Sequence, residues 1–294
     1  KFVSFLAEPP GRMNFVRNAL REGLLIEQAV GANPYKLGII ASTDTHLGAA
    51  GYVREDAHPG HGGAGMAAPG ELPAGLLDDI EFNPGGLAVI WAEENSRDAL
   101  FAALRRREVY GTSGPRMVVR FFGGWNFAAD LCDRSDLAAA GYRDGVPMGG
   151  DLPAAPGASA APAFVVSALR DPGTRERSGT QLQRLQIVKG WARGGQTFER
   201  VYDIAGDADG TATVEAGTCR SQGDGFDRLC AVWRDPDFDP RASAFYYVRV
   251  LENPVCRWSA VACASAGVDC SLPGTIPAGF APCCDTRFPR TIQE

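Results

Sequence analysis

Six short runs rich in valine, phenylalanine and tyrosine follow one another in the second half of the chain, with turn residues and no helical period between them. The runs are residues 117–122, 163–169, 182–188, 198–204, 229–233 and 245–251. Several of them alternate apolar and polar side chains, which is typical of antiparallel strands that bury one face. With 36 glycines and 20 prolines among 294 residues, many turns are expected. These features predict an antiparallel β-sandwich over residues 116–252.

The first 115 residues show a different texture, in which helix and strand signals alternate. The expected elements are helices at residues 14–31 and from Asn95, and strands at residues 37–41 and 87–91. Both strand runs are apolar without alternation, as expected of strands that are buried on both faces of a parallel sheet. Three arginines at 105–107 fall in the last turn of the second helix, where cations complement the helix dipole. Residues 1–115 are therefore predicted to be α/β.

Five of the eight cysteines are crowded into the stretch from Cys256 to Cys284. No Cys-x2-Cys pair of the kind found in zinc ribbons is present. Wider spacings in a loop-rich tail favour disulfides, with a zinc site or buried free thiols as the alternatives. We expect Cys219–Cys230 as one disulfide and a Cys-rich tail over residues 253–294 that packs on the other domains. Because disulfides persist in oxidising compartments, a periplasmic or extracellular location follows.

Charge and composition exclude several functions. Lys and Arg number 29 against 35 Asp and Glu, a net charge of −6, so the chain lacks the basic surface that nucleic acids and anionic membranes attract. No apolar run approaches the roughly 20 residues of a membrane span. The Walker loop and the Gly-x-Ser-x-Gly elbow are absent from the sequence, which argues against a P-loop nucleotide site and serine-hydrolase chemistry.

A carboxylate and an imidazole, Asp44 and His46, stand two residues apart directly after the expected strand at 37–41. Functional side chains gather at the carboxyl ends of strands in α/β sheets. This pair of donors suits a divalent cation such as Zn, Mn or Fe. The alternative interpretation is a capped turn that carries a surface histidine.

The other two histidines, His58 and His61, lie in a long glycine-rich loop. This loop is either a lid that brings His61 to a metal as a ligand, or a solvated loop with surface histidines. Glu93 and Glu94 follow the second apolar run. They either face the same site or favour the dipole of the next helix.

Residues 38–46, Gly-Ile-Ile-Ala-Ser-Thr-Asp-Thr-His, resemble the last metal-ligand segment of the PHP superfamily (polymerase and histidinol phosphatase). Further segments at 83–87, 91–95, 106–116 and 245–254 resemble an exported PHP-like family that is labelled a domain of unknown function and is similar to carbaryl-hydrolase-type metallohydrolases. The resemblance spans nearly the whole chain. It implies that residues 1–115 are the late strands and helices of a distorted PHP-type β/α barrel that holds two or three metal ions, followed by the β-sandwich.

The resemblance also implies that Asp44 and His46 bind metal and that the family's opening His-x-His segment and other ligand segments precede Lys1. The apolar start of the chain fits this interpretation. We therefore expect the C-terminal part of a longer precursor, with the barrel completed by the N-terminal part of that precursor or by a second chain. An ordinary mature N-terminus after signal removal is the alternative.

Metal-dependent hydrolysis of a small-molecule ester is the function that these features predict. Phosphoesters are expected first and carboxylic or carbamate esters next, because kinship at the level of the fold does not choose between them. Asp44 is expected to bridge a metal or orient the attacking water, and His46 to coordinate. Arg116 is expected to bind an anionic substrate, unless it forms a surface ion pair. The second hypothesis is a non-catalytic binding or assembly module in which the sandwich and the Cys-rich tail contact a partner.

Overall fold

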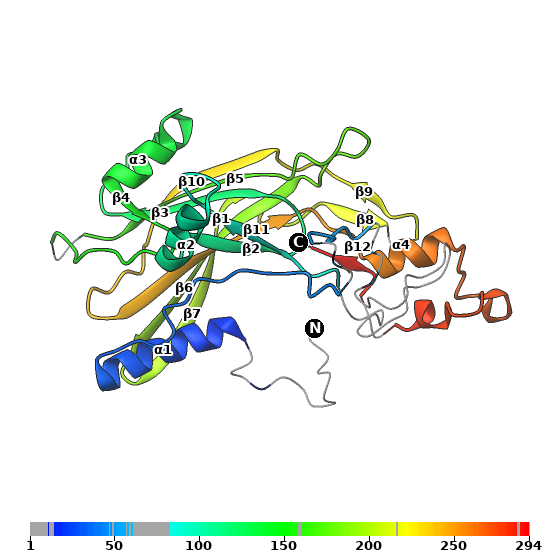
Figure 1. Cartoon of the computed structure of the whole chain (residues 1–294), viewed down its shortest axis with the longest axis horizontal. Helices are drawn as coiled ribbons and strands as arrows, with labels where there is room; N and C mark the ends of the chain where they lie inside the picture. Colours follow the sequence, from blue (N-terminus) through cyan, green and yellow to red (C-terminus); the bar gives the residue numbers. More distant parts are fainter. Residues whose placement is uncertain are drawn as a thin grey trace.

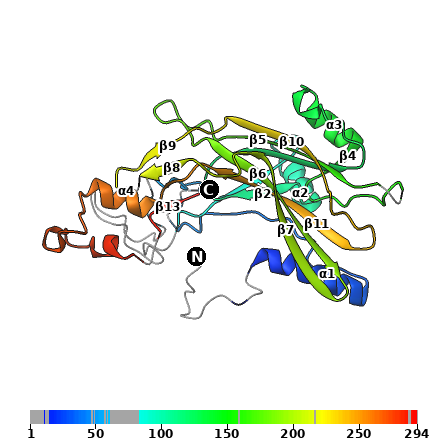
Figure 2. The ribbon, with the colours of Figure 1, turned by 180° about the vertical axis from the view of Figure 1, so that it is seen from behind.

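The computed structural model describes residues 11, 15–46, 48, 50–56, 58, 60, 83–157, 160–215, 217–286 and 289–293. Antiparallel sheets form the centre of the molecule, with helix α1 (Val16–Val30) below them and helix α3 (Leu137–Asp144) above them in Figure 1. A tail that contains helix α4 (Trp258–Ser265) extends beyond one end of the sheets, as the view from behind also shows (Figure 2).

Two larger antiparallel sheets contain the strands that the sequence predicts. One has the strand order β10–β5–β3–β4, and the other has the order β11–β6–β7. Their strands are β3 (Val118–Gly124), β4 (Gly145–Pro147), β5 (Ala163–Leu169), β6 (Leu182–Arg193), β7 (Gln196–Gly206), β10 (Arg228–Arg234) and β11 (Ser243–Glu252). All six expected runs are strands and all of their pairings are antiparallel, so this part of the prediction is confirmed.

The two sheets pack together through alternate side chains of their central strands. Phe164, Val166 and Ala168 of β5 share one buried cluster with Leu185 and Ile187 of β6. Every second side chain of a strand points to the same face, so each sheet contributes one face to this core. β6 is buried at almost every position because α1 lies against the opposite face of the same sheet.

The other face of the four-stranded sheet is covered by α3 and by the 3₁₀ turn η2 (Leu131–Asp133). Phe122 and Val165 of the sheet form a second buried cluster with Leu131 and Leu137. Cys132 in η2 forms a disulfide with Cys230 in β10, which ties this cover to the sheet.

The first part of the chain differs from the predicted parallel arrangement. Residues 37–41 do not form a strand, and Leu37, Ile39 and Ile40 are 54%, 38% and 50% exposed. The second run does form a strand, β1 (Leu87–Ile90), but it pairs antiparallel with β2 (Val109–Thr112). The described residues close no barrel, so the PHP-type barrel is not seen among them.

Helix α2 (Arg97–Arg106) explains why β1 and β2 are antiparallel. Ser96 caps its start, one residue after the expected Asn95, and Arg107 ends it with a left-handed φ of 63°. The chain then returns so that Val109 lies opposite Ile90. The helix is therefore part of the connection between two antiparallel strands, and it is not a crossover between parallel strands.

Two aromatic side chains fix the β1–β2 pair to the sandwich. The Tyr110 hydroxyl donates to the carbonyl of Met117 at 2.8 Å and accepts the N–H of Val119 at 3.0 Å. The indole of Trp91 donates to the carbonyl of Val119 at 3.0 Å. The β1–β2 pair is thus attached to β3 of the sandwich.

Four disulfides use all eight cysteines and correct the predicted pairing. Cys219 is bonded to Cys256, and Cys230 to Cys132, so the expected Cys219–Cys230 bond is wrong. The hairpin of β8 (Thr213–Glu215) and β9 (Arg220–Gln222) lies against β12 (Val255–Cys256), which carries Cys219 toward the tail and away from β10. Disulfides as such are confirmed.

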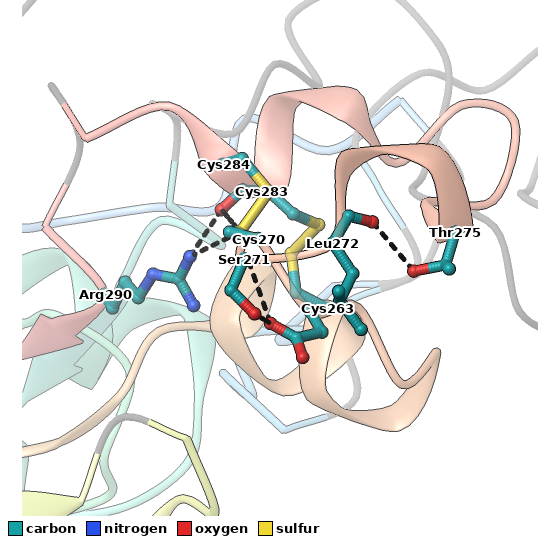
Figure 3. The surroundings of a disulfide bond; sticks show 9 residues. Cys263, Cys270, Ser271, Leu272, Thr275, Cys283, Cys284 and Arg290 are labelled. Atoms are coloured by element: carbon teal, nitrogen blue, oxygen red, sulfur yellow. Dashed lines mark hydrogen bonds between the residues drawn. A yellow bond between two sulfur atoms is a disulfide. The ribbon is translucent and has the colours of Figure 1, made fainter.

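The tail after β12 is held by the two remaining disulfides, Cys263–Cys283 and Cys270–Cys284 (Figure 3). Its other elements are the 3₁₀ turns η3 (Pro273–Thr275) and η4 (Ala281–Cys284) and the strand β13 (Thr291–Ile292), which pairs with β12. Arg290 donates to the carbonyl of Cys283 at 2.7 Å. Phe280 packs on the first of these disulfides in a small core of its own.

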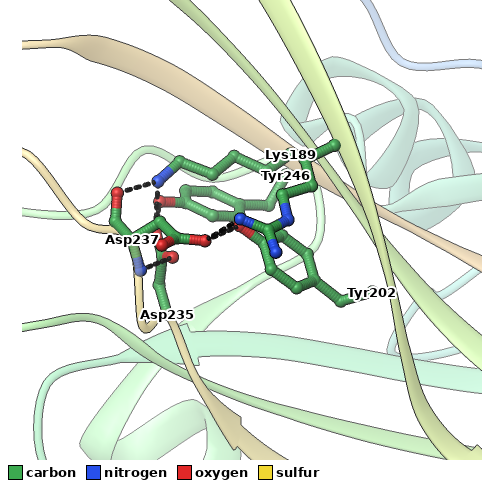
Figure 4. Close-up of polar contacts among 6 residues, drawn as sticks. Lys189, Tyr202, Asp235, Asp237 and Tyr246 are labelled. Atoms are coloured by element: carbon green, nitrogen blue, oxygen red, sulfur yellow. Dashed lines mark hydrogen bonds and ion pairs between the residues drawn. The ribbon is translucent and has the colours of Figure 1, made fainter.

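A buried ion pair joins the two larger sheets (Figure 4). Lys189 of β6 is 2.6 Å from the carboxylate of Asp235, which follows β10, and both residues are almost fully buried. Lys189 also donates to the carbonyl of Asp237 at 2.7 Å, and the Tyr246 hydroxyl donates to Asp235 at 2.6 Å. Each charge is therefore both paired and hydrogen-bonded, as a buried charge requires.

We expect Asp235→Asn to lower the free energy of unfolding by about 3–5 kcal/mol, because it leaves the Lys189 ammonium buried without a counter-charge. Combining it with Lys189→Met should restore part of that loss, since no uncompensated charge remains. Urea denaturation of the oxidised protein measures both effects. Arg241→Ala, which removes an exposed ion pair with Asp239, is the matched control and should change stability by less than about 1 kcal/mol. Equal losses in the single and double variants would contradict this account.

Candidate functional site

Residues 36–43 lie across the β1–β2 pair and are followed by the turn that carries Asp44 and His46. The carbonyl of Ser42 accepts the N–H of Gly86 at 2.8 Å, and Arg107 donates to the carbonyl of Lys36 at 2.9 Å. A Cβ on Gly111 of β2 would stand 2.9 Å from the backbone nitrogen of Ala41. The segment can therefore lie directly on β2 only because glycine occupies that position.

Asp44 and His46 stand in the turn at the end of this segment. Thr43 is buried and its hydroxyl accepts the N–H of Thr45 at 3.2 Å, which shapes the turn. Asp44 has a left-handed φ of 53°, a conformation that costs energy for a residue with a side chain. The side chains of Asp44 and His46 are exposed, and within the described residues neither makes a hydrogen bond or an ion pair. A carboxylate and an imidazole are thus presented to solvent from one turn.

Arg116 also has an exposed side chain, and it lies beside the loop that follows His46. A Cβ on Gly51 in that loop would stand 3.9 Å from the Arg116 guanidinium. The backbone N–H of Arg116 donates to Asp171 at 2.7 Å, whereas its guanidinium forms no ion pair with the described residues. The alternative prediction of a surface ion pair is therefore not seen in that part of the chain.

The remaining predicted residues take different positions. His61 lies outside the described residues, so its place as a metal ligand stays a prediction. The His58 ring packs on the Trp258 ring, with their centroids 5.2 Å apart. Glu93 and Glu94 are exposed, and Glu93 pairs with Arg106 at 3.1 Å near α2.

Glu55 is a titratable group that the sequence analysis missed. Its carboxylate accepts the N–H of Trp258, the first residue of α4, at 2.5 Å. Burial raises the pKa of Glu55 to about 7, against the weaker opposing effects of this hydrogen bond and of Arg257. A glutamate two hundred residues away in the sequence gives no local signal for such a contact.

Glu252, at the end of β11, is a second missed group and is only 2% exposed. Burial, with a smaller contribution from the negative charge of Asp171, raises the pKa of Glu252 to about 8. Arg170 and a hydrogen bond from Thr180 oppose the shift. One of its carboxyl oxygens is buried without a hydrogen-bond partner. Glu252 is thus neutral in most folded molecules at pH 7.

The described residues bring together no group of three or more His, Cys, Asp or Glu side chains that could hold a metal ion. Disulfide formation leaves no cysteine for such a role. Together, Asp44 and His46 offer one oxygen ligand and one nitrogen ligand, a pair that suits a divalent cation. A structural or catalytic metal needs at least one further protein ligand.

Together these features define a β-rich protein that has four disulfides and exposes the side chains of Asp44 and His46 on one turn beside the sandwich. The chain belongs to the family described as Protein of unknown function (DUF3604), whose family model matches residues 7–276. No curated protein and no solved structure matches the chain. Among the described helices, none has the length and the apolar character needed to cross a bilayer.

The raised pKa of Glu252 gives a testable pH dependence. Its folded pKa of about 8 lies above its ordinary value of 4.5, so the folded state binds the proton more tightly than the unfolded chain does. The contribution of Glu252 to stability is therefore fully present below pH 4.5 and is lost as the pH rises toward 8, by up to about 1.4 kcal/mol per pH unit.

We expect Glu252→Gln, which cannot ionise, to resemble the parent protein at pH 5 and to be more stable than it at pH 8. Urea denaturation at the two pH values measures this difference. Glu176→Gln, at an exposed position, is the control and should leave the difference between the two pH values unchanged. A Glu252→Gln protein whose stability parallels that of the parent at both pH values would contradict the assignment.

Proposed function

We propose that this chain is the C-terminal part of an exported metal-dependent hydrolase, in which Asp44 and His46 supply two of the metal ligands. The observation that carries this proposal is that Asp44 and His46 are exposed on one turn, make no side-chain hydrogen bond or ion pair within the described residues, and have a left-handed backbone conformation at Asp44. Strained backbone of this kind is concentrated at functional sites. The resemblance of residues 38–46 to the last PHP ligand segment supports the same assignment.

The remaining ligands come from outside the described residues. Two donors are too few for a catalytic metal, and the PHP-like sites that the chain resembles hold two or three ions of Zn, Mn or Fe. His61 is one further ligand that this chain can supply. The N-terminal part of the same precursor, or a second chain, supplies the others.

An exposed apolar surface next to the motif supports a completing polypeptide. Residues 37–40 present Leu37, Ile39 and Ile40 to solvent, and within the described residues the backbone of 38–41 makes no backbone hydrogen bond. A groove of about 970 Å³ opens beside this segment, between α1, β2 and β11. Exposed strand-like segments with apolar side chains pair readily with other strands. A strand added in parallel to 37–41 would bring its own carboxyl end to Asp44.

The chemistry follows from the donors. Bound divalent ions lower the pKa of a bound water toward 7 and stabilise negative charge that develops on the scissile group. Asp44 would hold such an ion or orient the attacking water, and His46 would hold an ion through a ring nitrogen. Arg116, whose guanidinium lies beside the same loop, binds the anionic part of a phosphoester or another ester substrate.

The same exposed surface also favours a second candidate function, a binding or assembly module without catalysis. In that case, residues 37–40 and the groove bind a partner, and the sandwich and the disulfide-braced tail serve as its scaffold. The disulfides support a periplasmic or extracellular location for either function.

Metal analysis of the intact protein, isolated together with any polypeptide that accompanies it, separates the two functions. The hydrolase hypothesis predicts bound Zn, Mn or Fe, and Asp44→Asn or His46→Ala should weaken metal binding by roughly tenfold or more. Glu94→Gln, at an exposed acidic position outside the turn, is the matched control and should keep the full metal content.

A mass spectrum recorded under denaturing conditions on the same sample shows whether a second polypeptide, or a longer form of this one, is present. A complete assembly without metal would refute the hydrolase hypothesis and leave the binding module. Full metal content in Asp44→Asn would refute the role of this residue as a ligand.

A further inference from the structure

Strand β11 is an edge strand that lies along the groove beside residues 37–40. It pairs with β6 on one side, and among the described residues no strand pairs with its other side. Residues 243–251 all line the groove of about 970 Å³, and β6 is the partner of their backbone–backbone hydrogen bonds within the described part of the chain. An exposed sheet edge of this kind can bind a further extended segment by strand addition.

The side chains of β11 divide between the sandwich core and the opposite face of the sheet. Tyr246, Val248 and Val250 pack on the core. Because side chains alternate along a strand, Tyr247 and Arg249 belong to the opposite face. Helix α1 lies against that face and contacts β7 and β11, at the end of the sheet that Figure 2 shows beside α1. Tyrosine and arginine are residue types that often dominate the energetics of protein interfaces.

Three arginines gather around the ring of Tyr247, one from β11 and two from α1, namely Arg249, Arg17 and Arg21. The acidic residue among them is Glu199 of β7, whose carboxylate is 3.5 Å from Arg17. Burial and the negative charge of Glu199 raise the pKa of the Tyr247 phenol, and the three arginines oppose this rise. All four charged groups thus lie near one ring, and a single carboxylate cannot neutralise three guanidinium groups.

Arg249 is the arginine whose charge is least satisfied. Its guanidinium makes no hydrogen bond or ion pair with the residues that the structure describes, and its Nε is buried. The Nε of Arg21 is also buried without an acceptor. Such N–H groups cost free energy unless an acceptor reaches them. The first turn of α1 contains no acidic residue, so the helix dipole adds to the positive charge there. A carboxylate matches the paired N–H groups of a guanidinium best.

We propose that the polypeptide that completes this protein lies along β11 as an extended segment and pairs an Asp or Glu side chain with Arg249. The inference rests on the proposed function in one respect, the existence of a completing polypeptide, and it does not depend on a metal ion. Apolar neighbours of that acid pack on Leu37 and Ile39, which line the same groove and are exposed. A small anion would satisfy Arg249 but would leave the β11 edge and this apolar surface uncovered.

Zero-length cross-linking of the intact assembly tests the ion pair. The sequence has lysine only at positions 1, 36 and 189, so Arg249→Lys adds an amine where the background is low. A carbodiimide joins this amine to a carboxylate that it contacts, with the loss of one water molecule, and mass spectrometry of the peptides identifies the acid. We expect an Asp or Glu that lies outside residues 1–294. Arg105→Lys, at an exposed position on α2, is the matched control and should not form this cross-link.

Lys36 provides an internal check on the reagent, because it is 3.3 Å from Asp151 and should be joined to it in every sample. If this internal cross-link forms and Arg249→Lys gives none, the proposal is overturned. A cross-link from position 249 to Glu199, or to another acid within residues 1–294, would overturn it equally. The same holds for an intact sample in which no polypeptide extends beyond residues 1–294.

Amide hydrogen exchange of residues 243–251 in the intact assembly is a second measurement that does not depend on the cross-linker. Arg249→Gln removes one partner of the ion pair, so exchange along this strand should become faster by roughly tenfold or more. Arg249→Lys keeps the charge and should stay close to the parent protein, and Arg105→Gln should not change the exchange. Equal protection in the parent protein and Arg249→Gln would contradict the ion pair.

Metal content measured on the same samples separates this inference from the proposed hydrolase. An assembly without metal that still forms the cross-link refutes the hydrolase and keeps the ion pair. An assembly with its full metal content and no cross-link at position 249 refutes the ion pair alone.

Discussion

The contact between the inner faces of two antiparallel sheets is the constraint on which the rest of this structure depends. β5 and β6 each place alternate apolar side chains into the common core, and the Lys189–Asp235 pair joins the same two layers at a buried position. Apolar burial at about 25 cal/mol per Å² provides most of the favourable free energy in such a core. The helices, the β1–β2 pair and the tail are all attached to this sandwich.

The candidate site is placed by that attachment and lies outside the core itself. Tyr110 and Trp91 fix the β1–β2 pair on β3, and Gly111 allows residues 36–43 to lie on β2. The turn that carries Asp44 and His46 is thus held at its base and exposed at its tip. The backbone of this turn is fixed where it contacts the sandwich, whereas the side chains of Asp44 and His46 face solvent. This openness is the physical reason for expecting a completing polypeptide, and it is equally what a docking surface would require.

The sandwich could be predicted from the sequence because each of its strands carries a local signal. The run 163–169 became β5 with the same bounds, since its valines and phenylalanine suit a strand that is covered on both faces. Residues 37–41 have the same texture but do not form a strand. Strand formation needs a neighbour in the sheet, and none of the described residues provides one, so local pattern alone was insufficient.

The pairing of the disulfides and the role of Glu55 were not predictable for a related reason. Cys219 and Cys230 are close in sequence, but the β8–β9 hairpin directs the first toward the tail while β10 turns the second toward η2. Likewise, the environment of Glu55 is made by Trp258, far away along the chain. Asp44 and His46, by contrast, are recognisable because both donors belong to one short motif after an apolar run. Sequence pattern therefore pointed to Asp44 and His46, whose role as metal ligands stays a prediction, and it missed the groups whose chemistry depends on tertiary burial.

Cys283 and Cys284 are consecutive, yet each is bonded to a different partner, Cys263 and Cys270 respectively. The alternative pairing, Cys263 with Cys284 and Cys270 with Cys283, would close loops of nearly the same lengths, so the chain entropy of the two pairings is nearly the same. Selection of the native pairing therefore falls to the packing of Phe280 against Cys263 and Cys283. The native covalent form of the tail is thus favoured by the packing of the folded tail, because the spacing of the cysteines alone does not distinguish the two pairings.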